Sequence, residues 1–165
     1  MANSSIIGNA KNKIIKEFIK DKDIIKAIGS STLNENKPEQ YINKHIFNFN
    51  QNPFTLTAVE TFITVQVHIP RSFDFNKTFI IPQIEIWVVS HERHMIVDNV
   101  PKVIENRNDY LSELIDKKLN GRNDFGIGTL QLVSNIEGSY QADYLYRKMI
   151  FETKDLNDSL CNKED

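Results

Sequence analysis

The segment "FITVQVHI", residues 62–69, has the clearest strand pattern in the chain. Every second residue of it is branched and apolar, namely Ile63, Val65, Val67 and Ile69. Because successive side chains of a strand point to opposite faces, this alternation predicts a strand with one buried face and one polar face. Pro70 ends the strand, since proline has no N–H to donate to a neighbouring strand.

A second strand is predicted from Thr78 to Ser90, after a connection at residues 71–77 with the sequence "RSFDFNK". Apolar and other side chains alternate in it, in the order Gln83, Ile84, Glu85, Ile86, Trp87 and Val88. Pro82 predicts an edge position or a bulge early in this strand. The two strands therefore indicate an antiparallel pair joined by a long loop.

The residues before these strands have the spacing of helices. An apolar stripe predicts a first helix that ends near Lys20, and it consists of Ile7, Ala10, Ile14, Ile15, Phe18 and Ile19. Asp23 is the expected cap of a short second helix that ends at Gly29. Pro38 is expected to open one more helical turn, and the Asn-rich segment 47–54 is expected to be irregular.

The strongest helix signal is "NRNDYLSELIDKKLNG", residues 106–121. Asn108 is the predicted N-cap, and Gly121 stands where a glycine commonly follows a helix. Two further strands are predicted at residues 129–136 and 144–153, joined by the turn "EGSYQAD". The resulting order is helix, two strands, helix, two strands.

This order predicts an α+β fold, a two-layer sandwich with a mostly antiparallel four-stranded sheet and the helices on one of its faces. The other face is expected to mix polar and aromatic side chains, namely Thr64, Gln66, Glu85, Lys148, Trp87 and Tyr146. We expect a single domain at residues 1–157, and a polar, flexible tail at residues 158–165.

Composition excludes some classes of protein. Twenty basic and 22 acidic side chains give a formal charge of −2, so no overall attraction to nucleic acid or to an anionic membrane is expected. No apolar run approaches the ~20 residues needed to cross a bilayer, and no secretory signal is expected at the N-terminus. The single cysteine, Cys161, cannot form an intrachain disulfide, which is compatible with a reducing cytoplasm.

The segment that most resembles a metal-binding or catalytic site is "IWVVSHERHMI", residues 86–96. His91 and His94 stand three residues apart, whereas zinc proteases carry His-Glu-x-x-His on a helix. On a continuing strand these two histidines would point to opposite faces, and on a helix they would share a face without a further ligand nearby. We therefore predict a solvated strand end that exposes His91, Glu92, Arg93 and His94, with no metal site.

Other catalytic patterns are also incomplete. The stretch "EIW" places Trp87 where a nuclease would need a lysine, and "FGIGTL" lacks the Lys-Ser/Thr of a phosphate-binding loop. The sequence therefore predicts no catalytic, cofactor-binding or metal-binding residues, no cofactor and no enzymatic activity. Distant residues can still converge in the fold, so a small nucleic-acid-processing enzyme stays open as an alternative.

The C-terminal half resembles a known class of proteins. The runs "RNDYLSELIDKKLNG", "FGIGTLQLVSNIEGSY" and "YLYRKMIFETKDLN" are similar to those of the small neck and tail-completion proteins of tailed bacteriophages, of the tail-terminator type. The resemblance extends over roughly residues 4–157, and its recognisable residues lie at 107–157. It implies a helix–hairpin–helix–hairpin fold.

The resemblance also implies a structural virion protein. Such proteins form rings, commonly hexameric, that complete the tail and join the tail tube to the head–tail connector. DNA would pass through the ring without sequence-specific binding, and assembly would take place in the host bacterial cytoplasm before the protein resides in the neck of the virion. The alternatives are the nucleic-acid-processing enzyme and a phage-encoded module that interacts with the host.

An oligomer interface is the functional site that the sequence favours. Phe73 and Phe75 in the 71–77 connection are candidate anchors together with Trp87, because large aromatic side chains anchor many protein interfaces. His91, Arg93 and Tyr146 complete the predicted interface set. The alternative, that these aromatic residues close the core of the domain itself, stays open.

Overall fold

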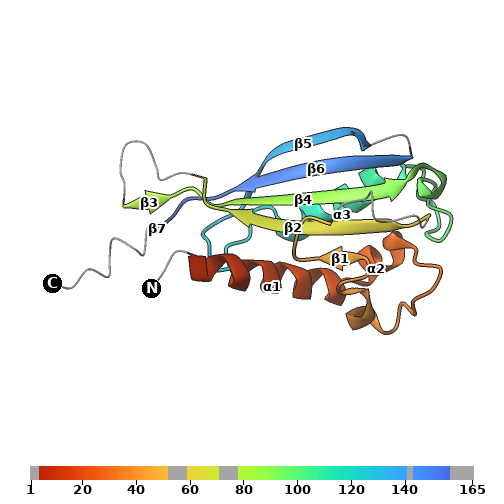
Figure 1. The fold of residues 1–165 in the computed structure, drawn as a ribbon, viewed down its shortest axis with the longest axis horizontal. Helices are drawn as coiled ribbons and strands as arrows, with labels where there is room; N and C mark the ends of the chain where they lie inside the picture. The colour runs from red at the N-terminus through yellow and green to blue at the C-terminus, as the bar shows by residue number, and fades with distance from the viewer. Residues whose placement is uncertain (1–3, 52–58, 71–77, 141–142, 157–165) are drawn as a thin grey trace.

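The computed structural model describes residues 4–51, 59–70, 78–140 and 143–156. The architecture is α+β, as predicted (Figure 1). The α-helices are α1 (Ser4–Lys20), α2 (Lys22–Ile28) and α3 (Arg107–Leu119), and two short 3-10 turns are η1 (Pro38–Tyr41) and η3 (Glu92–His94). The predicted tail, residues 158–165, lies outside the described residues.

The strands form one large and one small sheet. Their bounds are β1 (Ile46–Phe47), β2 (Thr61–His68), β3 (Phe79–Ile80), β4 (Gln83–His91), β5 (Gln131–Tyr140), β6 (Tyr144–Glu152) and β7 (Asp155–Leu156). The large sheet has the order β1-β2-β4-β6-β5, with β1 parallel to β2 and the other pairs antiparallel. The predicted four-stranded sheet was therefore wrong in two respects, since β1 adds a fifth, parallel strand, and β3 pairs with β7 in a separate two-stranded sheet.

Pro82 explains the separate sheet. It stands between β3 and β4, so the single strand predicted from Thr78 to Ser90 is divided there. The carbonyl of Pro82 accepts a hydrogen bond from the backbone N–H of Thr153, at 3.2 Å. Pro82 does not mark an edge strand, because β4 lies between β2 and β6 in the middle of the sheet. Instead the chain leaves the sheet, and β3 and β7 extend beyond its end (Figure 1).

Two helix caps differ from the predicted ones. Asp21, not Asp23, caps α2, and its carboxylate accepts from the backbone N–H groups of Asp23 and Ile24. Asn106, not Asn108, caps α3, and its side chain accepts from the N–H of Asp109 at 2.9 Å. In each case the helix starts earlier than expected, so the predicted cap lies inside the first turn.

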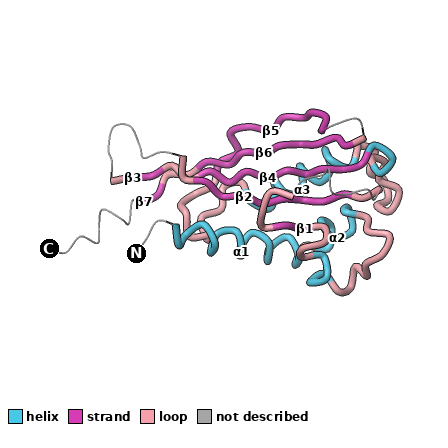
Figure 2. Tube along the Cα trace, in the orientation of Figure 1, coloured by secondary structure: helices cyan, strands magenta, loops and turns pink. Residues whose placement is uncertain are grey.

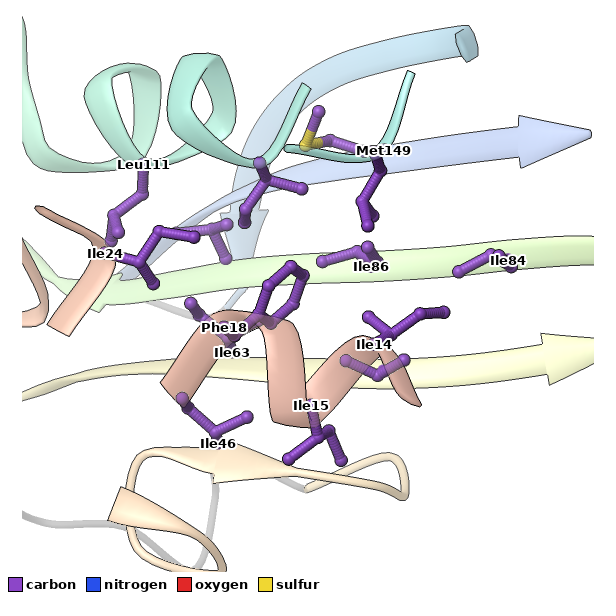
Figure 3. Packing of buried hydrophobic residues seen from close by; sticks show 14 of the residues in the cluster. Ile14, Ile15, Phe18, Ile24, Ile46, Ile63, Ile84, Ile86, Leu111 and Met149 are labelled. Carbon is purple, nitrogen blue, oxygen red and sulfur yellow. The ribbon is translucent and has the colours of Figure 1, made fainter. Parts of the chain in front are cut away.

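The three helices share one core with the inner face of the sheet. α1 packs on β2, and α3 packs on β4 and β6. Phe18, Ile63 and Ile86 are among the fully buried side chains that meet there (Figure 3). Burying one such side chain contributes roughly 1.5–3 kcal/mol, so this cluster is the main source of stability. The alternation correctly placed the apolar residues of β2 and β4 in this core, with the exception of Ile69, which lies beyond the end of β2 and is only half-buried.

The opposite face of the sheet carries a second, smaller cluster. Its buried members are Phe47, Phe62, Val89 and Tyr144. Thr64, predicted to be on a polar face, is only 1% exposed. β5 differs from the central strands, because it forms the edge of the sheet (Figure 2). Its burial pattern also shows exposed residues on both faces.

Candidate functional site

The histidine-rich end of β4 turns back onto the protein. His91 is the last residue of the strand, and its Nδ1 accepts from the backbone N–H of Arg93 in η3. Glu92 and Arg93 are exposed as predicted, whereas His91 and His94 are half-buried. The expectation that all four side chains face solvent was therefore wrong for the two histidines. Among the described residues, no group of three or more His, Cys, Asp or Glu side chains is placed to hold a metal ion.

His94 belongs to a buried chain of hydrogen bonds between the sheet and the helices. Its Nδ1 lies 2.8 Å from the hydroxyl of Thr61, and its Nε2 lies 3.2 Å from the carbonyl of Gly29. The Thr61 and Ser90 hydroxyls are 2.7 Å apart. A carbonyl oxygen only accepts, so Nε2 carries a proton and donates to the carbonyl of Gly29.

Asn108 closes this chain of hydrogen bonds on the helix side. Its side-chain oxygen accepts from the hydroxyl of Ser90 at 2.6 Å, and its amide donates to the carbonyl of Leu145 at 3.0 Å. Sequence reasoning missed this role, but a signal was present. Asn108 precedes Leu111 and Ile115 at the spacing of the buried stripe of α3, so a polar side chain there had to point into the protein. Buried polar groups need partners, which Ser90 and Leu145 supply.

Arg107 joins α3 to the segment after β4 and to the end of α2. Its side chain is 1% exposed. The guanidinium donates to three backbone carbonyls, those of Ala27 at 2.5 Å, His94 at 2.6 Å and Ile96 at 2.6 Å. The Ala27 carbonyl is at the C-terminal end of α2, where a positive charge is favourable. Arg107 therefore uses its fork of N–H donors to fix loop backbone.

Burial lowers the pKa of His94, and the positive charge of Arg107 lowers it further. The hydrogen bond to Gly29 and the carboxylate of Asp98 act in the opposite direction, while His45 also lowers the value. His94 is therefore held as a neutral imidazole at neutral pH. A neutral histidine in this position serves as a structural connector between β2 and α2, since both of its ring nitrogens have partners.

We expect the free energy of unfolding to fall as the pH drops below about 6.5, the ordinary pKa of histidine in an unfolded chain. The folded pKa of His94 is lower than the unfolded one, so the unfolded state binds the proton first and gains stability from it. Urea unfolding at several pH values between 7 and 5 would measure the slope. His94→Gln should flatten it, and the exposed His68→Gln serves as the control; equal slopes for wild type and His94→Gln would contradict this prediction.

Aromatic side chains form the most distinctive surface on the opposite face of the sheet. We call Trp87, Tyr140, Tyr144 and Tyr146 the aromatic face; Tyr144 is buried in it, and the other three side chains are half-buried. The ring centroids of Trp87 and Tyr146 are 4.6 Å apart. An added Cβ at Gly138 would come within 2.5 Å of the Tyr146 hydroxyl, so only glycine lets this ring lie across β5.

Polar groups hold Trp87 in place. Its indole N–H donates to Glu85 at 2.6 Å, and the ammonium of Lys148 lies 3.0 Å from the same carboxylate. The Lys148 ammonium is also 5.0 Å from the centroid of the Trp87 ring, within the range of a cation–π interaction. The arrangement presents an aromatic surface in a fixed orientation. It is suited to docking against another apolar or planar surface.

The structure places the predicted interface residues in different parts of the chain. Trp87 and Tyr146 meet on neighbouring strands β4 and β6, and His91 lies at the end of the same face, 5.2 Å from the ring of Tyr144. Arg93 is exposed in η3. Phe73 and Phe75 lie in residues 71–77, outside the described part of the chain.

Comparison with known proteins identifies a family. The family model described as YomW matches residues 21–153, from the cap of α2 to just past the end of β6. The description has the style of Bacillus phage names, and it indicates a phage-associated protein. No curated protein matches the chain. Among the described residues, no helix is long and apolar enough to cross a membrane.

Proposed function

Because the chain belongs to the YomW family, we propose that it is a structural protein of a tailed bacteriophage, located at the head–tail neck of the virion. In this proposal it forms a ring, commonly of six copies, that completes the tail and joins the tail tube to the head connector. DNA passes through the ring without sequence-specific binding. The protein carries out no chemistry and needs no cofactor.

The observation that carries this proposal is the aromatic face. It lies opposite the helices, and Trp87 and Tyr146 are half-buried there in a fixed arrangement. Tryptophan and tyrosine are enriched among the residues that dominate the binding energy of protein interfaces. A face that combines such side chains with charged neighbours, here Glu85 and Lys148, is suited to contact another protein subunit.

The hydrogen-bonded chain around His94 supports a structural role over a catalytic one. His94 contacts Thr61 and the Gly29 carbonyl, so its ring nitrogens are both engaged within the protein. Ser90 donates to Asn108 rather than to a base. A nucleophile and its base must be free to meet a substrate, and this chain connects backbone and side chains of the fold instead.

The oligomeric state tests the proposal. Native mass spectrometry and negative-stain microscopy of the purified protein should detect a closed ring, and antibody labelling of phage particles should place the protein at the neck. A monomer under all conditions, or label confined to another part of the particle, would refute the neck assignment. An increase in melting temperature on adding Mg²⁺ or Zn²⁺ would favour the nucleic-acid-processing enzyme.

Trp87→Ala is expected to yield a folded protein that no longer forms the ring, because the indole anchors the contact. Gly138→Ala should weaken the ring to a smaller extent, since it displaces Tyr146 from Trp87. Size-exclusion chromatography with light scattering would measure both effects. Tyr110→Ala removes a half-buried aromatic side chain from α3 and serves as the control. An intact ring in Trp87→Ala would remove the aromatic face from the interface.

A further inference from the structure

Within the described residues, the strand β5 lies at the edge of the large sheet, and no second strand pairs with its outer side. It pairs with β6 on one side and forms the end of the large sheet on the other (Figure 2). At ten residues it is a long strand, and both of its faces contain exposed side chains. At its start the backbone N–H of Leu132 donates to the side-chain oxygen of Asn120 at 3.2 Å, so the open part of the edge begins after Leu132. The outward N–H and C=O groups of this open part have the geometry of a sheet ladder and are a template for a further strand.

The sequence of β5 has few of the features that prevent an edge strand from pairing with a strand of another molecule. Proteins commonly protect edge strands with lysine, proline or bulges. β5 contains no lysine or proline, and Glu137 is its single charged residue. Its register shift lies between Leu132 and Ser134, so the pairing from Ser134 to Tyr140 is regular. The exposed fractions of Val133 and Ile136 are 52% and 51%, which adds apolar surface to the open edge.

We propose that this edge binds β5 of a second copy of the chain, so that two sheets join into one. The lengths of the described edge strands favour this pairing. The other described strands at the edges of the two sheets, β1, β3 and β7, have two residues each. A strand-to-strand contact of useful length between described strands of two copies is therefore β5 with β5. Two identical strands that pair with each other do so about a two-fold axis, which makes them antiparallel.

The side chains of β5 define a register. With Ile136 on the axis, the exposed Ile136 side chains of the two copies face each other, and Asn135 faces Glu137 of the second copy. A pairing centred on Glu137 would place two carboxylates opposite each other, which is unfavourable. A pairing centred on Asn135 would place Ile136 opposite Ser134. The register centred on Ile136 therefore places the two Ile136 side chains opposite each other and no like charges directly opposite.

This pairing concerns the free protein and goes beyond the neck assignment. A contact about a two-fold axis closes on itself, whereas a head-to-tail ring needs a different contact between neighbours. The β5 pair therefore predicts a dimer in solution whether or not the chain later joins a phage particle. A β5 dimer that never assembles into a ring would refute only the neck proposal, and a ring without the β5 contact would refute only this inference.

Two substitutions of Asn135 test the register, because they are expected to change the strength of dimerisation in opposite directions. Asn135→Lys places a cation opposite Glu137 of the second copy, twice per dimer, and should tighten dimerisation roughly 2- to 30-fold. Asn135→Glu should weaken it to a similar extent. Within one chain Asn135 lies 3.5 Å from Arg147, which also contacts the carboxylates of Asp109 and Glu137, so the effect of each substitution on the stability of the single chain is measured separately. Sedimentation velocity over a range of concentrations would measure the dimer, and thermal unfolding would measure the single chain.

Amide hydrogen exchange provides an independent readout of the edge. Alternate amides in residues 134–139 should become protected as the protein concentration rises, while those of β2 should not change. A monomer at all concentrations would overturn the proposal. So would a dimer that lacks this protection, or a dimer that Asn135→Glu tightens and Asn135→Lys weakens.

Discussion

We expect Gly29→Ala to lower the free energy of unfolding by about 3–5 kcal/mol. Gly29 follows the last residue of α2 with φ +65°, a left-handed conformation that costs a residue with a side chain about 1 kcal/mol or more. The larger part of the loss comes from Arg107. An added Cβ would overlap its Nη1 and lie 3.1 Å from its Cζ, so the guanidinium would have to leave the three carbonyls that it contacts.

Gly121→Ala is the matched control for this substitution. Gly121 also has a left-handed backbone, with φ +79°, but no atom lies within 4 Å of an added Cβ. We expect it to cost about 1–2 kcal/mol, which is the conformational part alone. Urea unfolding, followed by the fluorescence of the single tryptophan, would compare the two variants. Equal losses for Gly29→Ala and Gly121→Ala would show that the contact with Arg107 has no energetic importance.

The contrast between Gly29 and Arg107 shows how far the sequence predicts this fold. The glycine is identified from local chemistry, because it ends a short apolar helix where a left-handed residue is common. Arg107 is not, since the carbonyls that it contacts belong to segments distant in sequence, at residues 27, 94 and 96. Periodicity reports which side of an element is buried, and it does not report which polar groups meet there.

The same limit applies to the sheet. The alternation in β2 and β4 predicted the core face correctly, since that pattern extends over eight or more residues. β1 was missed, because two residues are too short to show a period. Its pairing with β2 also buries Phe47 near Phe62, which explains why the second face is more apolar than predicted.

For the candidate site, the sequence identified aromatic residues but not their arrangement. Trp87 and Tyr146 were both predicted, and the structure places them in contact across β4 and β6. Gly138 was not predicted, because its importance depends on the ring of Tyr146 that lies over it. The histidines were interpreted from their spacing alone. His94 is instead determined by its partners Thr61 and Gly29, which come from two other segments.

The second large effect is expected for Arg107→Met, a loss of about 3–5 kcal/mol. Methionine replaces much of the apolar stem, but it leaves the carbonyls of Ala27, His94 and Ile96 without their donors. For a domain of this size, such a loss lowers the melting temperature by roughly 10 °C. Arg122→Met is the control, because the ion pairs of Arg122 with Glu17 and Asp124 lie nearer the surface and contribute about 0–1 kcal/mol. A similar melting temperature for the two variants would contradict the role of Arg107.

Combining the two substitutions separates their causes. If Gly29→Ala destabilises mainly by displacing the guanidinium, it should cost only about 1–2 kcal/mol in the Arg107→Met background, where the flexible methionine can move away. The two losses would then be strongly non-additive, as expected for residues in contact. Additive losses would mean that the left-handed end of α2 requires glycine by itself. A non-additive cycle would instead show that the buried arginine determines which residue can end this helix, so the end of α2 and the start of α3 form one energetic unit.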